Sequence, residues 1–287
     1  MSSRRKPVET LDPRINVPEQ YMGVAANVRS RFNVYKHAAD GRDLHTEIID
    51  NIPLGGHETV VDVGCSDGAT LLKMRVQLGH QGPLIGVDLD RSLFLPTELQ
   101  MDRIGGLRPI TFMQGEATHL DFVDDSVDAL MALFMLYHVP NPEDALREFK
   151  RVVRPGGQIA IATSGRLNKF RHREFERSLA ASLGVSPPPI FASPFNNDVA
   201  EQILPKHFEA IERNSQITEM IIGPDQVDDY LLSIQSMRTT FDPLPQSPQW
   251  GEAVNWLVRK PIEEEIAAQG FFWDAIERYY YICENPT

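Results

Sequence analysis

Short apolar segments alternate with helical segments between residues 59 and 163, and this alternation constrains the fold more than any other feature of the sequence. Five segments are typical of strands, because they are short, apolar and rich in β-branched residues: 59–63, 84–87, 110–113, 127–134 and 158–163. Helical patterns lie between them at about 68–78, 91–103 and 142–153. Strands and helices that alternate at this spacing predict crossover connections and a parallel sheet with helices on both faces.

The helix expected at 142–153 has recognisable signals at both ends. Asn141 is a residue type that caps helices, and Pro142 suits the first helical position. The sequence Arg-Pro-Gly-Gly at 154–157 is expected to end the helix and turn the chain into the next strand.

The pattern is less regular outside this region. Residues 1–20 predict an extended or mobile arm, and 21–51 has a helical composition that includes a helix at about 44–52. Toward the C-terminus we expect helices at 166–183, 225–237 and 249–268, one or two strands at 208–222, and a last strand or hairpin at 270–283.

Charge and cysteine content exclude several classes of protein. The 287 residues include 28 Lys and Arg against 40 Asp and Glu, a net charge of −12, which disfavours nucleic acid as a partner. The two cysteines, Cys65 and Cys283, form neither a disulfide framework nor a zinc motif, so a reducing cytoplasm is the expected location. The longest apolar run, 129–137, is too short for a membrane span of about 20 residues, and the first residues do not fit a secretory signal.

The loop after the first expected strand, DVGCSDG at 62–68, is where a ligand is expected to bind. Gly64 and Gly68 allow close approach to the backbone, but they lack the third glycine of a dinucleotide site. Asp62 and Asp67 would repel a diphosphate and tolerate a cation, while Asp88, about 20 residues further on, is placed for ribose hydroxyls. A nucleoside without phosphate and with a positive charge fits this pattern, and S-adenosylmethionine meets that description.

The chain resembles the class I S-adenosylmethionine-dependent methyltransferases, in particular the small-molecule, methyltransferase type 11-like branch. The segments that carry the resemblance span about 57–163: VVDVGCSDG at 60–68, GVDL at 86–89, GEA at 115–117, DDSVD at 124–128, YHVPNP at 137–142 and LREFKRVVRPGG at 146–157. The resemblance implies a Rossmann-like α/β fold with a seven-stranded, mostly parallel sheet whose last strand is antiparallel. It also implies one catalytic domain in three parts: an arm and lid helices at 1–50, a cofactor-binding core at 51–165, and further strands at 166–287 with helical cap insertions at 166–200 and 224–268.

The resemblance also implies a set of cofactor-binding residues. Asp62 is expected near the amino group of the cofactor, Asp88 at the ribose hydroxyls and Glu116 at the adenine amino group. The full set is Asp62, Gly64, Cys65, Ser66, Gly68, Asp88, Leu89, Glu116, Ala117 and Leu133. The sequence departs from the family at Ser66-Asp67, where Gly-Thr is commoner, and at Glu116, where Asp is commoner.

Several residues have both a functional and a structural interpretation. His138 follows the fourth strand, where it is a candidate general base or a residue that orients the loop, and Tyr137 has a similar but weaker case. Tyr21 and Tyr35 lie on the N-terminal helical segment, where they are core residues or part of a lid over the cofactor. Cys65 is expected to be a small loop residue rather than a nucleophile, and His172 is expected at the surface.

The function expected from this pattern is methyl transfer from S-adenosylmethionine to an O, N or C atom of a small organic molecule such as a secondary metabolite, with S-adenosylhomocysteine as the product. No metal, nucleic acid or membrane is expected, and the exposed cap helices leave a homo-oligomer open. Three alternatives remain at this point: an NAD-dependent oxidoreductase, a non-catalytic cofactor-binding protein, and a methyltransferase that modifies a macromolecule.

Overall fold

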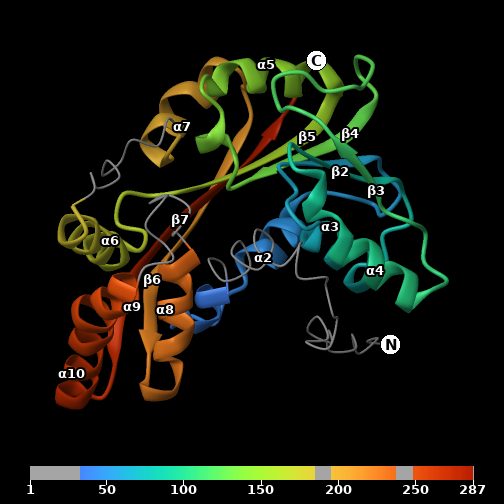
Figure 1. Ribbon diagram of the computed structural model, residues 1–287. Helices are drawn as coiled ribbons and strands as arrows, with labels where there is room; N and C mark the ends of the chain where they lie inside the picture. The colour runs from blue at the N-terminus through green and yellow to red at the C-terminus, as the bar shows by residue number, and fades with distance from the viewer. Residues whose placement is uncertain (1–32, 185–194, 237–247, 287) are drawn as a thin grey trace.

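One sheet organises the molecule, in a computed structural model that describes residues 33–184, 195–236 and 248–286. The described strands form a seven-stranded sheet in the order β3-β2-β1-β4-β5-β7-β6 (Figure 1). They are β1 (Val60–Val63), β2 (Leu84–Asp88), β3 (Thr111–Gln114), β4 (Val127–Leu133), β5 (Val153–Ser164), β6 (Ile211–Ile222) and β7 (Phe272–Glu284). Strand β7 runs antiparallel to both β5 and β6, and the pairs from β3 to β5 are parallel. The expected fold class is therefore confirmed.

Helices cover both faces of the sheet, which is why the central strands are mostly apolar. Helices α2 (Leu44–Asn51) and α3 (Ala69–Gln77) pack on one face, and α4 (Leu95–Ile104) lies beside α3 (Figure 1). Helices α5 (Pro142–Val152) and α7 (Asn197–Ile203) pack on the other face. The short turns η2 (Arg91–Leu93) and η3 (Leu136–His138) follow β2 and β4.

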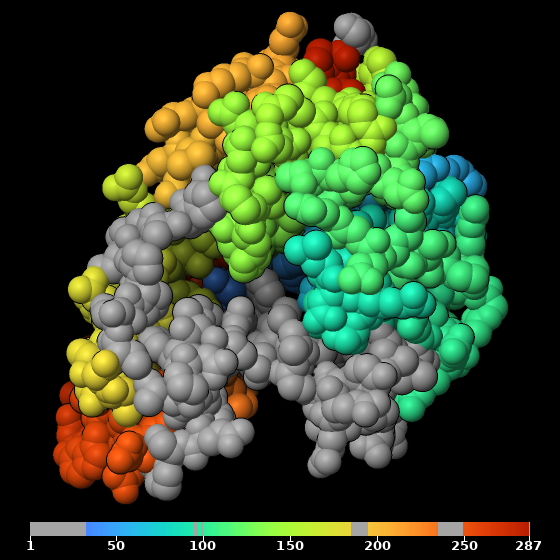
Figure 2. All heavy atoms as spheres, turned by 45° about the horizontal axis from the view of Figure 1, so that its top comes forward, coloured from blue at the N-terminus to red at the C-terminus, as the bar shows by residue number. Residues whose placement is uncertain are grey.

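A helical cap is built on the far ends of β6 and β7. It contains α6 (Phe170–Ser182), α8 (Val227–Ser236), α9 (Pro248–Val254), the π-helical turn Asn255–Arg259 and α10 (Lys260–Gln269). Their apolar side chains form one cluster with Met220 and Ile222 of β6 and Phe272 and Ile276 of β7. In Figure 2 the orange and red residues of this cap lie at the lower left, and the cyan and green residues of the parallel half lie at the right.

The structure differs from the expected elements at several places. Strand β5 begins at Val153, earlier than expected, because Val153 pairs with Val127 before a register shift leads to the pair Gln158 and Ala129. The segments at 208–222 and 270–283 each form a single long strand, since they pair with one another along their length. Asn141 precedes α5 as expected, but its side chain makes no capping hydrogen bond.

The N-terminal described segment is only partly α-helical. Residues Val34–His37 form the 3-10 turn η1, and α2 follows at Leu44. An isolated bridge between Ala38 and Met220 joins η1 to β6, so this segment contacts the cap end of the sheet. The division into parts at 1–50, 51–165 and 166–287 stays a prediction. None of the helices in the described ranges combines the length and apolar composition needed to cross a bilayer.

Candidate active site

A cavity of about 1270 Å³ lies at the carboxyl ends of the parallel strands. This is the edge at which open α/β sheets bind ligands, because loops from neighbouring strands meet there. Of the residues expected at the site, those that line the cavity are Tyr35, Asp62, Gly64, Cys65, Ser66, Asp88, Leu89, Glu116, Ala117, Leu133, Tyr137 and His138. Gly68 is absent from the lining, and Tyr21 lies outside the described residues.

The loop between β1 and α3 requires glycine at two positions. Gly64 has φ +71°, and a Cβ atom there would lie 2.6 Å from Cβ of Met135. Its amide donates to the carbonyl of Val87 at 2.7 Å, so the loop is held against the end of β2. Gly68 has φ +73°, and a Cβ atom there would lie 2.5 Å from the ring of Phe112. Gly64 thus allows Met135 to pack against the loop at the cavity, whereas Gly68 serves the turn into α3.

Three carboxylates gather at this loop. The side chain of Asp62 is buried, and burial, followed by the charges of Asp88 and Asp67, raises its pKa to about 8. Asp88 Oδ2 accepts a hydrogen bond from the amide of Ser66 at 2.9 Å, and Asp67 Oδ1 accepts from the amide of Ala69 at 3.2 Å. This end of the cavity can hold a cation and accept hydrogen bonds from hydroxyl groups.

Cys65 cannot act as a nucleophile in this environment. Its side chain is buried, and burial raises the pKa of the thiol, with further contributions from Asp62 and Asp88. The thiol therefore stays protonated, as its interpretation as a small loop residue requires.

The loop after β3 brings Glu116 and Ala117 beside Asp88. The amide of Gly115 donates to the carbonyl of Asp88 at 3.0 Å, which joins this loop to the end of β2. Glu116 is exposed and its Oε1 accepts from the hydroxyl of Thr118 at 2.9 Å, while Ala117 is buried. These residues extend the cavity on the β2 and β3 side of the sheet, where an adenine ring is expected.

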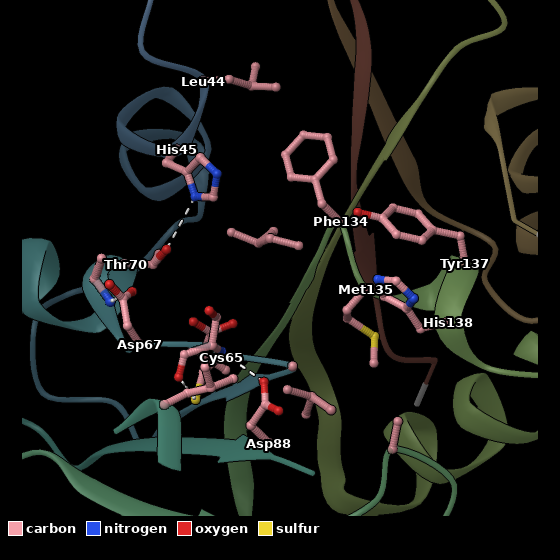
Figure 3. Close-up of a pocket in the computed structure, with 18 of the residues that line it drawn as sticks. Leu44, His45, Cys65, Asp67, Thr70, Asp88, Phe134, Met135, Tyr137 and His138 are labelled. Carbon is pink, nitrogen blue, oxygen red and sulfur yellow. Dashed lines mark hydrogen bonds between the residues drawn. The ribbon is translucent and has the colours of Figure 1, made fainter. Parts of the chain in front are cut away.

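The opposite wall comes from the chain that follows β4. Figure 3 shows Met135, Tyr137 and His138 facing the side of the cavity that carries His45 and Thr70. Tyr137 is half-buried and His138 is exposed, and their ring centroids lie 4.5 Å apart in an edge-on arrangement. His138 therefore lies at the cavity with access to solvent, and its role as a base stays a prediction.

Tyr35 closes the cavity on the cap side. Asn168 Nδ2 donates to its hydroxyl at 2.7 Å, and the guanidinium carbon of Arg278 lies 4.0 Å from its ring centre. These contacts hold Tyr35 over the ligand edge of the sheet, a position that suits a lid residue.

Sequence reasoning did not find the cavity residues that α2, α3 and β7 contribute, among them His45, Thr70 and Arg278. His45 Nδ1 lies 3.2 Å from the hydroxyl oxygen of Thr70, and burial, followed by the charge of Arg278, lowers the His45 pKa to about 4. The imidazole is therefore neutral at pH 7. No local signal marks these residues, because their positions depend on how distant elements pack.

The expectation for His172 was wrong. His172 is buried in the cap, where Nδ1 lies 3.3 Å from Glu176 Oε1 and Nε2 lies 3.3 Å from the hydroxyl of Ser233. It faces the cap interior because α6 packs against α8 there. Across the described part of the chain, no group of three or more His, Cys, Asp or Glu residues could hold a metal ion.

Comparison with known families identifies the central part of this structure. The family model described as a methyltransferase domain matches residues 61–161, which run from β1 to β5. The match includes residues 62–68, the acidic loop between β1 and α3 at which the three carboxylates gather. The chain contains a class I S-adenosylmethionine-dependent methyltransferase domain. This family match supports the expected cofactor and gives no support to an oxidoreductase.

Relatives of the methyltransferase domain match it over limited lengths. Methyltransferase GfsG of Streptomyces halstedii is 30% identical over 128 residues, which are 44% of this chain and 44% of that protein. Demethylmenaquinone methyltransferase of Bacillus velezensis is 30% identical over 114 residues, 40% of this chain and 48% of that protein. The chain thus spans less than half the length of these curated relatives.

A solved structure shares the fold of the methyltransferase domain and of much of the remaining chain. Phosphoethanolamine N-methyltransferase 2 of Haemonchus contortus, in complex with S-adenosyl-L-methionine, matches with a TM-score of 0.56 and 16% identity. The match covers 93% of this chain and 58% of that chain. At this identity the likeness shows the fold alone.

Proposed function

We propose that this protein is an S-adenosylmethionine-dependent methyltransferase that acts on an O, N or C atom of a small organic molecule. The observation that carries the proposal is the acidic loop of the methyltransferase domain, where Asp62, Asp67 and Asp88 converge beside the backbone of Gly64. A cationic nucleoside without phosphate matches this arrangement, and a dinucleotide does not.

The residues present fit the cofactor. Gly64 lines the cavity beside Asp62, Asp67 and Asp88, so the cofactor's charged and hydroxyl groups would meet carboxylate oxygens there. Asp62 would hold the amino group of the cofactor, Asp88 would accept hydrogen bonds from the ribose hydroxyls, and Glu116 would face the adenine amino group. Ser66, Leu89, Ala117 and Leu133 would complete the surroundings of the nucleoside.

S-adenosylmethionine, when bound, supplies an electrophilic methyl group on a sulfonium. The chain's own task is to orient the acceptor and exclude water. Leu133 and Phe134 give the cavity an apolar wall at the end of β4, and Tyr35 covers it from the cap side. His138 would take a proton from an acceptor hydroxyl or amine, and an acceptor carbon would need it only after transfer.

The size and charge of the molecule support a small acceptor. A cavity of about 1270 Å³ is large enough for a nucleoside together with a further small molecule. The net charge of −12 disfavours nucleic acid as a substrate, and the name of one relative states demethylmenaquinone, a small molecule, as its acceptor. Both cysteines are buried and free, which supports a location in the reducing cytoplasm.

Cofactor binding provides the direct test. Calorimetric titration with S-adenosylhomocysteine should show binding, and Asp88→Asn should weaken it by about 10-fold, because an amide accepts fewer hydrogen bonds from the ribose than a carboxylate. Asp90→Asn is the matched control, since Asp90 caps η2 and does not line the cavity. Binding of NADH in place of S-adenosylhomocysteine would contradict the proposal.

Turnover of His138→Ala tests the proposed base. With an acceptor found by screening for transfer of a labelled methyl group, this variant should lower kcat by about 10²-fold and leave cofactor affinity unchanged. Tyr137→Phe is the companion variant, because it keeps the ring beside His138. An unchanged kcat in His138→Ala would assign the residue to loop structure.

A further inference from the structure

Four Lys and Arg side chains line the cavity, and one of them differs from the rest. Three have a carboxylate partner: Lys36 pairs with Asp229, Arg42 with Glu47 and Lys73 with Asp43. Arg278 makes no ion pair among the described residues, because no carboxylate oxygen there lies within 4.0 Å of its guanidinium nitrogens. Of these four positive charges, that of Arg278 is therefore the one without a carboxylate partner in the described part of the chain.

Arg278 is held in place without being neutralised. The residue is only 3% exposed, and one terminal nitrogen donates to Oε1 of Gln216 on β6. The guanidinium lies against the Tyr35 ring, with its carbon 4.0 Å from the ring centre, and 5.8 Å from that of Phe134. Its Nε atom is buried and has no hydrogen-bond partner within the described ranges. A buried charge with an unused donor costs free energy unless a ligand pairs it.

The position of Arg278 across the sheet separates it from the nucleoside end. The acidic loop follows β1, whereas Arg278 lies on β7, three strands away in the order β1-β4-β5-β7. At a strand spacing of about 4.8 Å, the backbones of β1 and β7 are separated by roughly 14 Å. Arg278 pairs in register with Ser164 at the carboxyl end of β5, so its backbone lies at the same ligand edge as Leu133 and Phe134. The cavity is thus acidic at one end and carries an unpaired cation at the other.

We propose that Arg278 is the specificity-determining residue of the acceptor site and that it binds a carboxylate on an acceptor whose aromatic or apolar body lies against Tyr35 and Phe134. A guanidinium matches the planar geometry of a carboxylate and forms paired hydrogen bonds with it. The two aromatic rings that flank the guanidinium provide the apolar surface on which the body of the acceptor packs. This inference rests on the proposed function, because it names the substrate class of that site.

The experiment compares matched probes on the protein saturated with S-adenosylhomocysteine. Pairs of similar shape in which a neutral amide replaces the carboxylate, such as 4-hydroxybenzoate with 4-hydroxybenzamide and 2-naphthoate with 2-naphthamide, are titrated by calorimetry or ligand-observed NMR. The carboxylates should bind about 10-fold more tightly than the amides. Arg278→Met should remove this preference, and Arg278→Lys should keep part of it.

A control variant isolates the effect of the cavity. Arg213 on β6 also lies over a tyrosine of β7, with its guanidinium carbon 4.8 Å from the Tyr279 ring centre, but it does not line the cavity. Arg213→Met should keep the preference for carboxylates. S-adenosylhomocysteine affinity and thermal unfolding, measured for each variant, show whether Arg278→Met still folds. If it does not, Arg278→Lys decides: a preference smaller than that of the unmodified protein supports the inference, and an unchanged preference overturns it.

Three results would overturn the inference. Equal binding of carboxylates and amides, or no binding of either, would show that the site does not select an anion. A preference that survives Arg278→Met would place the anion elsewhere. A loss of S-adenosylhomocysteine affinity in Arg278→Met, with the preference intact, would assign Arg278 to the cofactor carboxylate. Failure of the proposed function is distinct, because it appears as absent S-adenosylhomocysteine binding in the unmodified protein.

Discussion

Opposite charges occupy the two ends of one cavity, and at the scale of single residues this arrangement explains most of the site. Asp62 is buried next to two other carboxylates, so its ionised form is disfavoured until a cation binds. Arg278 is buried beside aromatic rings and lacks a carboxylate partner in the described ranges. A bound ligand of opposite charge would therefore lower the free energy of the ionised group at each end of the cavity.

The pKa of Asp62 predicts a pH dependence for cofactor binding. Its ordinary value of 3.8 rises to about 8 in the folded protein, so its contribution to the stability of the free protein is present below about pH 4 and lost as the pH rises through 8. A bound cation favours the ionised form. Binding of S-adenosylmethionine near pH 7 should therefore release a proton, and the affinity should increase between pH 6 and pH 8.

Calorimetry in two buffers that differ in ionisation enthalpy measures this proton release. Asp62→Asn is the control, because it cannot ionise and should bind without releasing a proton at this position. Equal proton release in the two proteins would show that another group titrates.

At the scale of elements, strand β7 joins the two halves of the molecule. Its C-terminal half pairs with β5 in the parallel half, and its N-terminal half carries the cap. Asp274 on β7 is fully buried and accepts hydrogen bonds from the amides of Arg171 and His172 at 3.0 Å and from the hydroxyl of Tyr230 at 2.7 Å. The amides belong to the first turn of α6, whose free donors a carboxylate satisfies.

Asp274→Asn should destabilise the cap more than the parallel half. An amide nitrogen would face donors that now meet a carboxylate oxygen, at a cost of about 2 kcal/mol or more in the free energy of unfolding. Hydrogen exchange should then increase in α6 and α8 and stay low in β1 and β4. Tyr230→Phe, which loses one hydrogen bond, should cost about 1 kcal/mol. Exchange that increases equally in all elements would show that the cap has no separate stability.

At the scale of the whole molecule, the sequence predicted the architecture better than the details of the cap. Alternating strands and helices predicted the parallel half, because a strand buried on both faces must be apolar and its crossover helices must be amphipathic. The cap helices at 166–183, 225–237 and 249–268 were expected in about the right places, but the burial of His172 was not. A histidine in a polar helix shows no sign of being buried until the neighbouring helix is in place.

The sequence by itself determined the acidic end of the site. Asp62 and Asp88 lie at the carboxyl ends of β1 and β2, and Gly64 directly follows β1; the carboxyl ends of parallel strands meet at one edge whatever the rest of the chain does. The other end was decided only by tertiary structure. Arg278 and His45 reach the same cavity because β7 inserts antiparallel between β5 and β6 and because α2 packs over the sheet, and both arrangements depend on contacts between residues that lie far apart in the chain.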